Sequence, residues 1–73
     1  MNLRTKLSLY ETASECGCWM LVTGNEVRIP QQHTDEQYEK ICDTLERKGL
    51  AIKSIKFSEM HNGKVTRLIV TNN

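Results

Sequence analysis

Three cysteines and two histidines carry the most reactive side chains of this chain. Cys16 and Cys18 are separated by one residue, Cys42 lies further along, and the histidines are His33 and His61. Thiolate and imidazole groups are the ligands that zinc prefers in proteins. Structural zinc motifs, however, usually place two or more residues between paired cysteines and repeat the pair, and this chain has no second pair. We therefore expect no metal site, and we expect these cysteines to pack as small apolar residues.

An enzyme with a cysteine nucleophile is the alternative interpretation of the same residues, with Cys16 beside His33 or His61. Thiolate catalysis requires an accessible, activated thiol and a third group that orients the base, and no spacing here specifies them. A chain of 73 residues also has little room for a core and a substrate pocket. Its four glycines are isolated and form no phosphate-binding loop. We expect a protein that is not an enzyme and needs no cofactor.

The composition is that of one small folded domain. Apolar residues make up 38% and charged residues 26%, which excludes a disordered tail. A chain this short builds a thin core, so a partner or a self-associating strand edge would add support. The longest apolar run, Trp19–Val22, is far too short to span a membrane, and the first residues lack the apolar core of a signal peptide. We expect a cytoplasmic protein without a membrane partner.

Charge is spread unevenly, although the net charge is only +1. Acidic residues dominate positions 35–46, whereas most cations lie in segments that predict strands. A basic sheet face would suit a nucleic acid backbone, and nearby Tyr10 or Trp19 would stack on bases. The near-zero net charge provides no long-range attraction to nucleic acid, so a solvated strand face is the simpler interpretation.

The segment Thr34–Leu50 predicts a helix with a defined start and end. Thr34 is a suitable N-cap, and Gln37 three residues later completes a capping box. Gly49 can adopt the left-handed conformation that ends a helix. Between these ends, an apolar stripe recurs with helical spacing at Tyr38, Ile41, Cys42 and Leu45.

Three strands are predicted before this helix. Residues 3–10 alternate between apolar and polar side chains, which is typical of a strand with one buried face. Residues 11–17 are polar and end in glycine, so we expect a loop. The apolar run 18–23 and the alternating residues 26–29 flank Gly24-Asn25 and predict a hairpin. Pro30 should end its second strand, because proline has no N–H to donate to a ladder.

A second hairpin is predicted after the helix, from residues 52–60 and 64–71 around Asn62-Gly63. With these two residues as the loop, Phe57 lies opposite Leu68. Ile55 then lies opposite Val70, so these four apolar residues share one face, which we expect to belong to the core.

A bulge is expected near residues 53–54, because Ile52 is out of phase with Ile55. Together the segments predict a small single-domain α+β fold over residues 1–73, in the order β-β-β-α-β-β. One mainly antiparallel sheet would carry a single helix packed on one face.

The other face of the second hairpin holds more apolar residues than a fully solvated face needs. Trp19, the only tryptophan, would be a strong contact residue if exposed. The predicted binding residues are therefore Trp19, Lys56, Met60, Val65, Arg67 and Ile69.

We expect a small protein-interaction module that binds a host or cognate protein, with a homodimer through a strand edge as a further association. Compact chains of this size without catalytic motifs are common among phage or mobile-element accessory proteins that inhibit or regulate a host complex. A nucleic-acid-binding module that uses the basic sheet face is the alternative.

Overall fold

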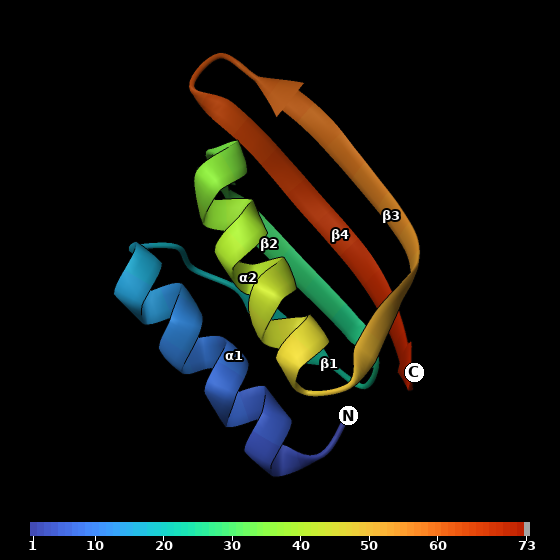
Figure 1. Ribbon diagram of the computed structural model, residues 1–73. Coiled ribbons are helices and arrows are strands. Elements are labelled where there is room, and N and C mark those ends of the chain that lie inside the picture. Colours follow the sequence, from blue (N-terminus) through green and yellow to red (C-terminus); the bar gives the residue numbers. More distant parts are fainter. Residues whose placement is uncertain (73) are drawn as a thin grey trace.

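The computed structural model describes residues 1–72, apart from the side chain of Met60. It shows a small α+β domain with two helices and a four-stranded antiparallel sheet (Figure 1). The elements follow the order α1 (Leu3–Cys16), β1 (Leu21–Thr23), β2 (Glu26–His33), α2 (Asp35–Arg47), β3 (Leu50–Met60) and β4 (Gly63–Asn72). The α+β class and the antiparallel sheet are as predicted, but the predicted order with three strands before a single helix is wrong.

The first segment forms helix α1 and not a strand. Asn2 caps it, because its side-chain oxygen accepts a hydrogen bond from the Thr5 N–H at 2.8 Å. Thr5, Leu9 and Ala13 recur every four residues and are all buried. Leu3 and Leu7, which made the sequence look like an alternating strand, are exposed. The alternation was therefore a coincidence within a helical pattern.

The predicted loop at residues 11–17 is also wrong, since α1 continues to Cys16. The Thr12 hydroxyl lies 2.8 Å from the Thr44 hydroxyl of α2, and the Tyr10 hydroxyl accepts a hydrogen bond from the Val22 N–H at 3.1 Å. These contacts fix α1 beside α2 and against β1. Tertiary contacts of this kind cannot be seen in a local sequence pattern.

Helix α2 is confirmed, and so are its predicted ends. The Thr34 hydroxyl accepts from the Gln37 N–H at 3.2 Å, and the Gln37 side chain accepts from the Thr34 N–H at 2.9 Å. After the helix, Gly49 has φ +75° and donates its N–H to the Glu46 carbonyl at 3.0 Å. Ile41 and Leu45 of the predicted stripe are fully buried.

The first hairpin differs from its prediction in length. Strand β1 contains only residues 21–23 of the predicted 18–23, whereas β2 continues past Pro30 to His33. Its register against β4 shifts between Ile29 and His33, which places Pro30 at an irregularity where a missing N–H is tolerated. The prediction that Pro30 ends the strand was therefore wrong.

The second hairpin turns one residue earlier than predicted. Met60 pairs with Gly63, so His61 and Asn62 form the turn and Phe57 lies opposite Thr66. A β-carbon on Gly63 would lie 2.6 Å from the His33 carbonyl oxygen, and the backbone there has φ +140°, so this position needs glycine both for close strand approach and for its own conformation. The bulge expected at residues 53–54 is confirmed between Ile52 and Ser54.

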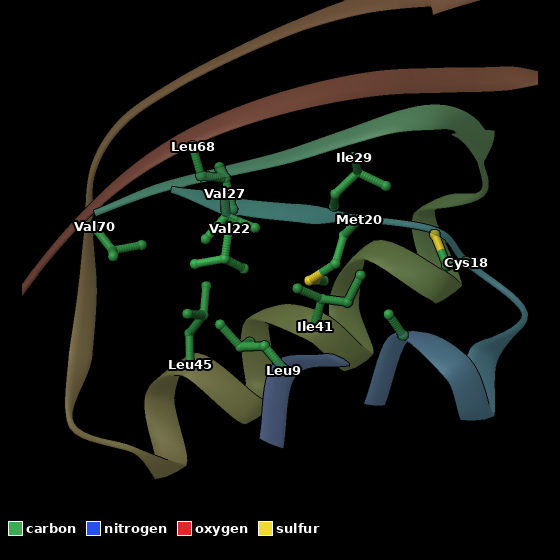
Figure 2. Packing of buried hydrophobic residues seen from close by; sticks show 11 residues of the cluster. Leu9, Cys18, Met20, Val22, Val27, Ile29, Ile41, Leu45, Leu68 and Val70 are labelled. Atoms are coloured by element: carbon green, nitrogen blue, oxygen red, sulfur yellow. The ribbon is translucent and has the colours of Figure 1, made fainter. Parts of the chain in front are cut away.

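The sheet order is β1-β2-β4-β3, and both helices cover one face of it. In Figure 2 the core lies between the sheet and the helices, where Leu9, Ile41 and Leu45 face Val27 and Leu68. Strand β3 lies at the side of the sheet away from both helices (Figure 1). For this reason Ile55 and Phe57 are exposed, and only Leu68 and Val70 of the four predicted core residues are buried.

Candidate functional site

The face of the sheet that carries no helix is called here the open face. Residues alternate between the two faces along each strand. Val27 and Leu68 are opposite each other and buried under the helices, so their neighbours Arg28 and Arg67 project from the open face. Lys56, opposite Arg67 in β3, is exposed on the same face.

Three cations thus form a line across the sheet, which we call the cation row: Arg28, Arg67 and Lys56. Arg28 of β2 is the direct cross-strand partner of Arg67 of β4, and Arg67 is the direct partner of Lys56 of β3. Neighbouring strands are about 4.8 Å apart, so the row is roughly 10 Å long at the backbone. Like charges directly opposite each other destabilise a sheet. The cation row should therefore make the sheet less stable than neutral residues at the same three positions would.

One carboxylate partly neutralises the cation row. Glu26 is half-buried, with Oε1 3.4 Å from the Nε of Arg28 and Oε2 3.0 Å from the Nη2 of Arg67. Lys56 makes no ion pair with any carboxylate of the described residues. Three positive charges against one negative charge leave a local surplus of two. The site is therefore suited to an anionic ligand.

The cation row borders a shallow, open depression of about 340 Å³. The row residues share its lining with Pro30, Ser58 and Val65. Cationic side chains and the apolar Pro30 and Val65 thus line the same depression, a combination that accepts a carboxylate next to an apolar side chain. The depression is too open to enclose a small substrate.

Four of the predicted binding residues share the open face. Lys56 and Arg67 are exposed, and Val65 and Ile69 are half-buried on either side of Arg67 along β4. The side chain of Met60 lies outside the described residues. Trp19 is 56% exposed but precedes β1, and it lines a separate hollow with Tyr10 and Gln31. The structure thus brings four of the six residues together and leaves Trp19 apart.

Sequence reasoning missed two residues of this site, Arg28 and Glu26. The alternation of residues 26–29 already placed both of them opposite the apolar Val27 and Ile29. The pairing of β2 with β4 could not be predicted from the sequence pattern, because this contact joins segments about forty residues apart. The cation row exists only through that pairing.

Within residues 1–72, no three side chains from His, Cys, Asp and Glu form a group that could hold a metal ion. Cys18 is buried and Cys42 half-buried, and burial raises the pKa of both thiols. Burial also raises the pKa of Tyr38, and its hydrogen bond with Cys42 adds to this effect. Raised thiol pKa values oppose formation of a nucleophilic thiolate.

No protein-family model matches the sequence, and no curated protein sequence matches it either. Neither described helix is long and apolar enough to cross a membrane.

Proposed function

We propose that this protein is a small non-enzymatic interaction module that binds an Asp- and Glu-rich segment of a partner protein on the open face. The observation that carries this proposal is the cation row, in which Arg28, Arg67 and Lys56 lie directly opposite one another with one carboxylate among them. An acidic ligand would relieve their mutual repulsion. Carboxylates also accept paired hydrogen bonds from arginine side chains.

A protein ligand suits this face better than a nucleic acid. Binding of single strands relies on aromatic side chains that stack on bases. Of the four aromatic residues, Tyr10 and Tyr38 lie on helices, Trp19 precedes β1, and Phe57 alternates to the helix side of β3. The open face instead combines arginine with the apolar residues Val65 and Ile69, a composition found at the centres of protein interfaces.

The test is a binding titration with two labelled probes, a peptide of mixed Glu, Asp and Leu residues and a single-stranded DNA of mixed sequence. We expect the wild-type protein to bind the peptide more tightly than the DNA. Arg67→Glu should weaken peptide binding by about 1–3 kcal/mol, as expected for loss of a charge contact at an interface. Its fold should be preserved, because Arg67 is exposed.

Arg4→Glu is the matched control, because it makes the same change at an exposed residue of α1. Equal weakening by Arg4→Glu would show that only the net charge matters. Preference for DNA, lost in Arg67→Glu, would establish the nucleic-acid alternative. If Glu39→Lys or Asp43→Lys abolished binding while Arg67→Glu left it unchanged, the binding site would lie on the acidic face of α2 and not on the open face.

The wider role, regulation or inhibition of a host complex by a phage or mobile-element accessory protein, is part of the proposal and rests on chain length and the lack of catalytic motifs. Affinity capture from a lysate of the native host, with wild type and Arg67→Glu in parallel, identifies the partner. A protein with an acidic segment that is captured only by wild type supports the proposal.

A further inference from the structure

The free edge of β3 is the longest unpaired edge of the sheet. Strand β3 has 11 residues and, within the described residues, pairs only with β4. The opposite edge, β1, has only three residues, and short edge strands are one way in which proteins prevent association. The bulge between Ile52 and Ser54 protects one end of β3, but residues 54–60 pair regularly with β4.

Apolar side chains lie along this edge on the helix side of the sheet. Ile55 and Phe57 are opposite the buried Leu68 and Thr66, yet they are 42% and 53% exposed, and Ile52 beyond the bulge is 40% exposed. The helices do not reach them, because α2 lies in front of β2 and β4 separates β2 from β3 (Figure 1). We call Ile52, Ile55 and Phe57 the edge strip. A single copy of the chain leaves this part of its core face uncovered.

The direction of the free backbone groups follows from one hydrogen bond. The Val70 N–H donates to the Asn25 carbonyl at 2.9 Å, so Val70 and, by alternation, Leu68 and Thr66 direct their backbone groups towards β2. The residues between them then bond to Ser54, Lys56 and Ser58 of β3. The N–H and C=O groups of Ile55, Phe57 and Glu59 therefore point outwards from the free edge.

We infer that the edge of β3 pairs with β3 of a second copy in an antiparallel, two-fold symmetric arrangement centred on Phe57. Phe57 then lies opposite Phe57 of the second copy, and Ile55 lies opposite Glu59. All the outward groups of these three residues are paired, because each such pair exchanges two N–H···O=C bonds. The result is one continuous eight-stranded sheet with all four helices on the same side.

The neighbouring registers are less favourable. A pair centred on Lys56 places two ammonium groups directly opposite each other, which destabilises a sheet. A pair centred on Ile55 places Phe57 opposite residue 53 at the bulge, where the ladder is irregular. The Phe57-centred register instead sets Lys56 opposite Ser58.

A second copy is the occupant that fits, because the edge is self-complementary. A two-fold axis perpendicular to the sheet matches odd-numbered residues of β3 with odd-numbered residues of the other copy. The two Phe57 rings therefore meet on the helix side, flanked by the Ile55–Glu59 pairs, and Lys56 meets Ser58 on the open face. The contact is a single ladder of about 24 Å, shorter than a standard interface requires, so we infer a weak dimer. The two cation rows would share one open face.

Sedimentation tests the dimer, and this test does not depend on the proposed ligand. From about 10 µM to about 1 mM, a range that covers weak affinities, the wild-type mass should rise towards that of a dimer. Phe57→Glu should remain a monomer, because two carboxylates would face each other across the axis. It should keep its fold, since the new carboxylate lies near Lys64, whose ammonium is 5.2 Å from the Phe57 ring. Leu7→Glu is the matched control, because Leu7 is 58% exposed on α1. This variant should dimerise like the wild-type protein.

Cysteine cross-linking tests the register. Phe57→Cys should form a reducible dimer on mild oxidation, because paired α-carbons about 5.5 Å apart lie within disulfide range. Ile55→Cys should not exceed the wild-type background, since the two copies of residue 55 are four positions out of alignment. A wild-type protein that stays monomeric across the range, or Leu7→Glu abolishing the dimer while Phe57→Glu does not, would overturn the proposal. Preferential cross-linking of Ile55→Cys would exclude this register.

Discussion

The Nε2 atom of His33 lies 2.8 Å from the hydroxyl oxygen of Thr66, a residue 33 positions further along the chain. The Nδ1 atom of the same ring lies 2.8 Å from the Gln31 carbonyl oxygen. Because a carbonyl only accepts, Nδ1 carries the proton, and Nε2 accepts the hydroxyl proton of Thr66. This buried histidine joins the end of β2, beyond the irregularity at Pro30, to β4.

Thr66→Val tests this connection. Valine has nearly the same shape as threonine but cannot donate a hydrogen bond, so the Nε2 atom of His33 would be buried without a partner. We expect a loss of about 1–3 kcal/mol in the free energy of unfolding, measured by urea denaturation. Thr71→Val, at an exposed position of the same strand, is the control and should change little. Equal effects at the two positions would show that the His33–Thr66 bond is not a major source of stability.

The elements that could be predicted are those whose signals are local. Helix α2 contains its own cap at Thr34 and its own ending at Gly49, so its bounds could be read without knowledge of the rest of the fold. Helix α1 could not, because Leu3 and Leu7 are apolar but exposed, whereas the small residues Thr5 and Ala13 face the core. Which apolar residues are buried was decided by packing against α2, and that is not a local property.

The register of the second hairpin shows the same limit. Asn62-Gly63 is a strong local turn signal, yet Gly63 is used for close approach to His33 of β2, and the turn moves to residues 61–62. Because the resulting shift is two residues, each side chain stays on its predicted face. Lys56, Val65, Arg67 and Ile69 therefore share a surface as expected. The depth of burial at Ile55 and Phe57 was not predictable, since it depends on which strands of the sheet the helices cover.

Gly49→Val tests the ending of α2. A β-carbon at Gly49 would meet no atom within 4 Å, so the cost arises only from the backbone at φ +75°. A β-branched residue resists this conformation, and we expect a loss of about 1 kcal/mol or more in thermal or urea unfolding. Gly49→Asn should cost less, because asparagine tolerates the left-handed region better. Unchanged stability in Gly49→Val would show that the left-handed ending is not required.

The buried thiols predict a loss of stability at alkaline pH. Burial raises the pKa of Cys18 and Cys42 above the ordinary value of a cysteine thiol, so the folded state holds these protons more tightly than the unfolded chain does. The contribution of the two protonated thiols to the free energy of unfolding is fully present below about pH 9, and it is lost as the pH rises through the folded-state pKa. Urea midpoints between pH 8 and pH 11 should therefore decrease more steeply in wild type than in Cys42→Ala. Ser14→Ala, which shortens a small side chain without a titrating group, is the control, and its urea midpoints should change with pH as those of wild type do. If the midpoints of all three proteins fell equally with pH, the predicted contribution of the thiols would be contradicted.

The cation row predicts that stability and binding change in opposite directions at Lys56. Lys56→Gln removes the cation that has no carboxylate partner among the described residues, so stability at low salt should rise by a few tenths of a kcal/mol, about the size of a surface charge pair. The gain should vanish near 1 M NaCl, where the screening length falls to about 3 Å. Lys40→Gln, on the acidic face of α2, should instead lower stability, because Lys40 follows Glu36 at helical spacing.

The same Lys56→Gln protein should bind the acidic peptide more weakly, as expected where a surface is less stable than it could be because it serves binding. A Lys56→Gln variant that is no more stable at low salt than at high salt would show that the row is not repulsive, and the main support for an acidic ligand would be lost.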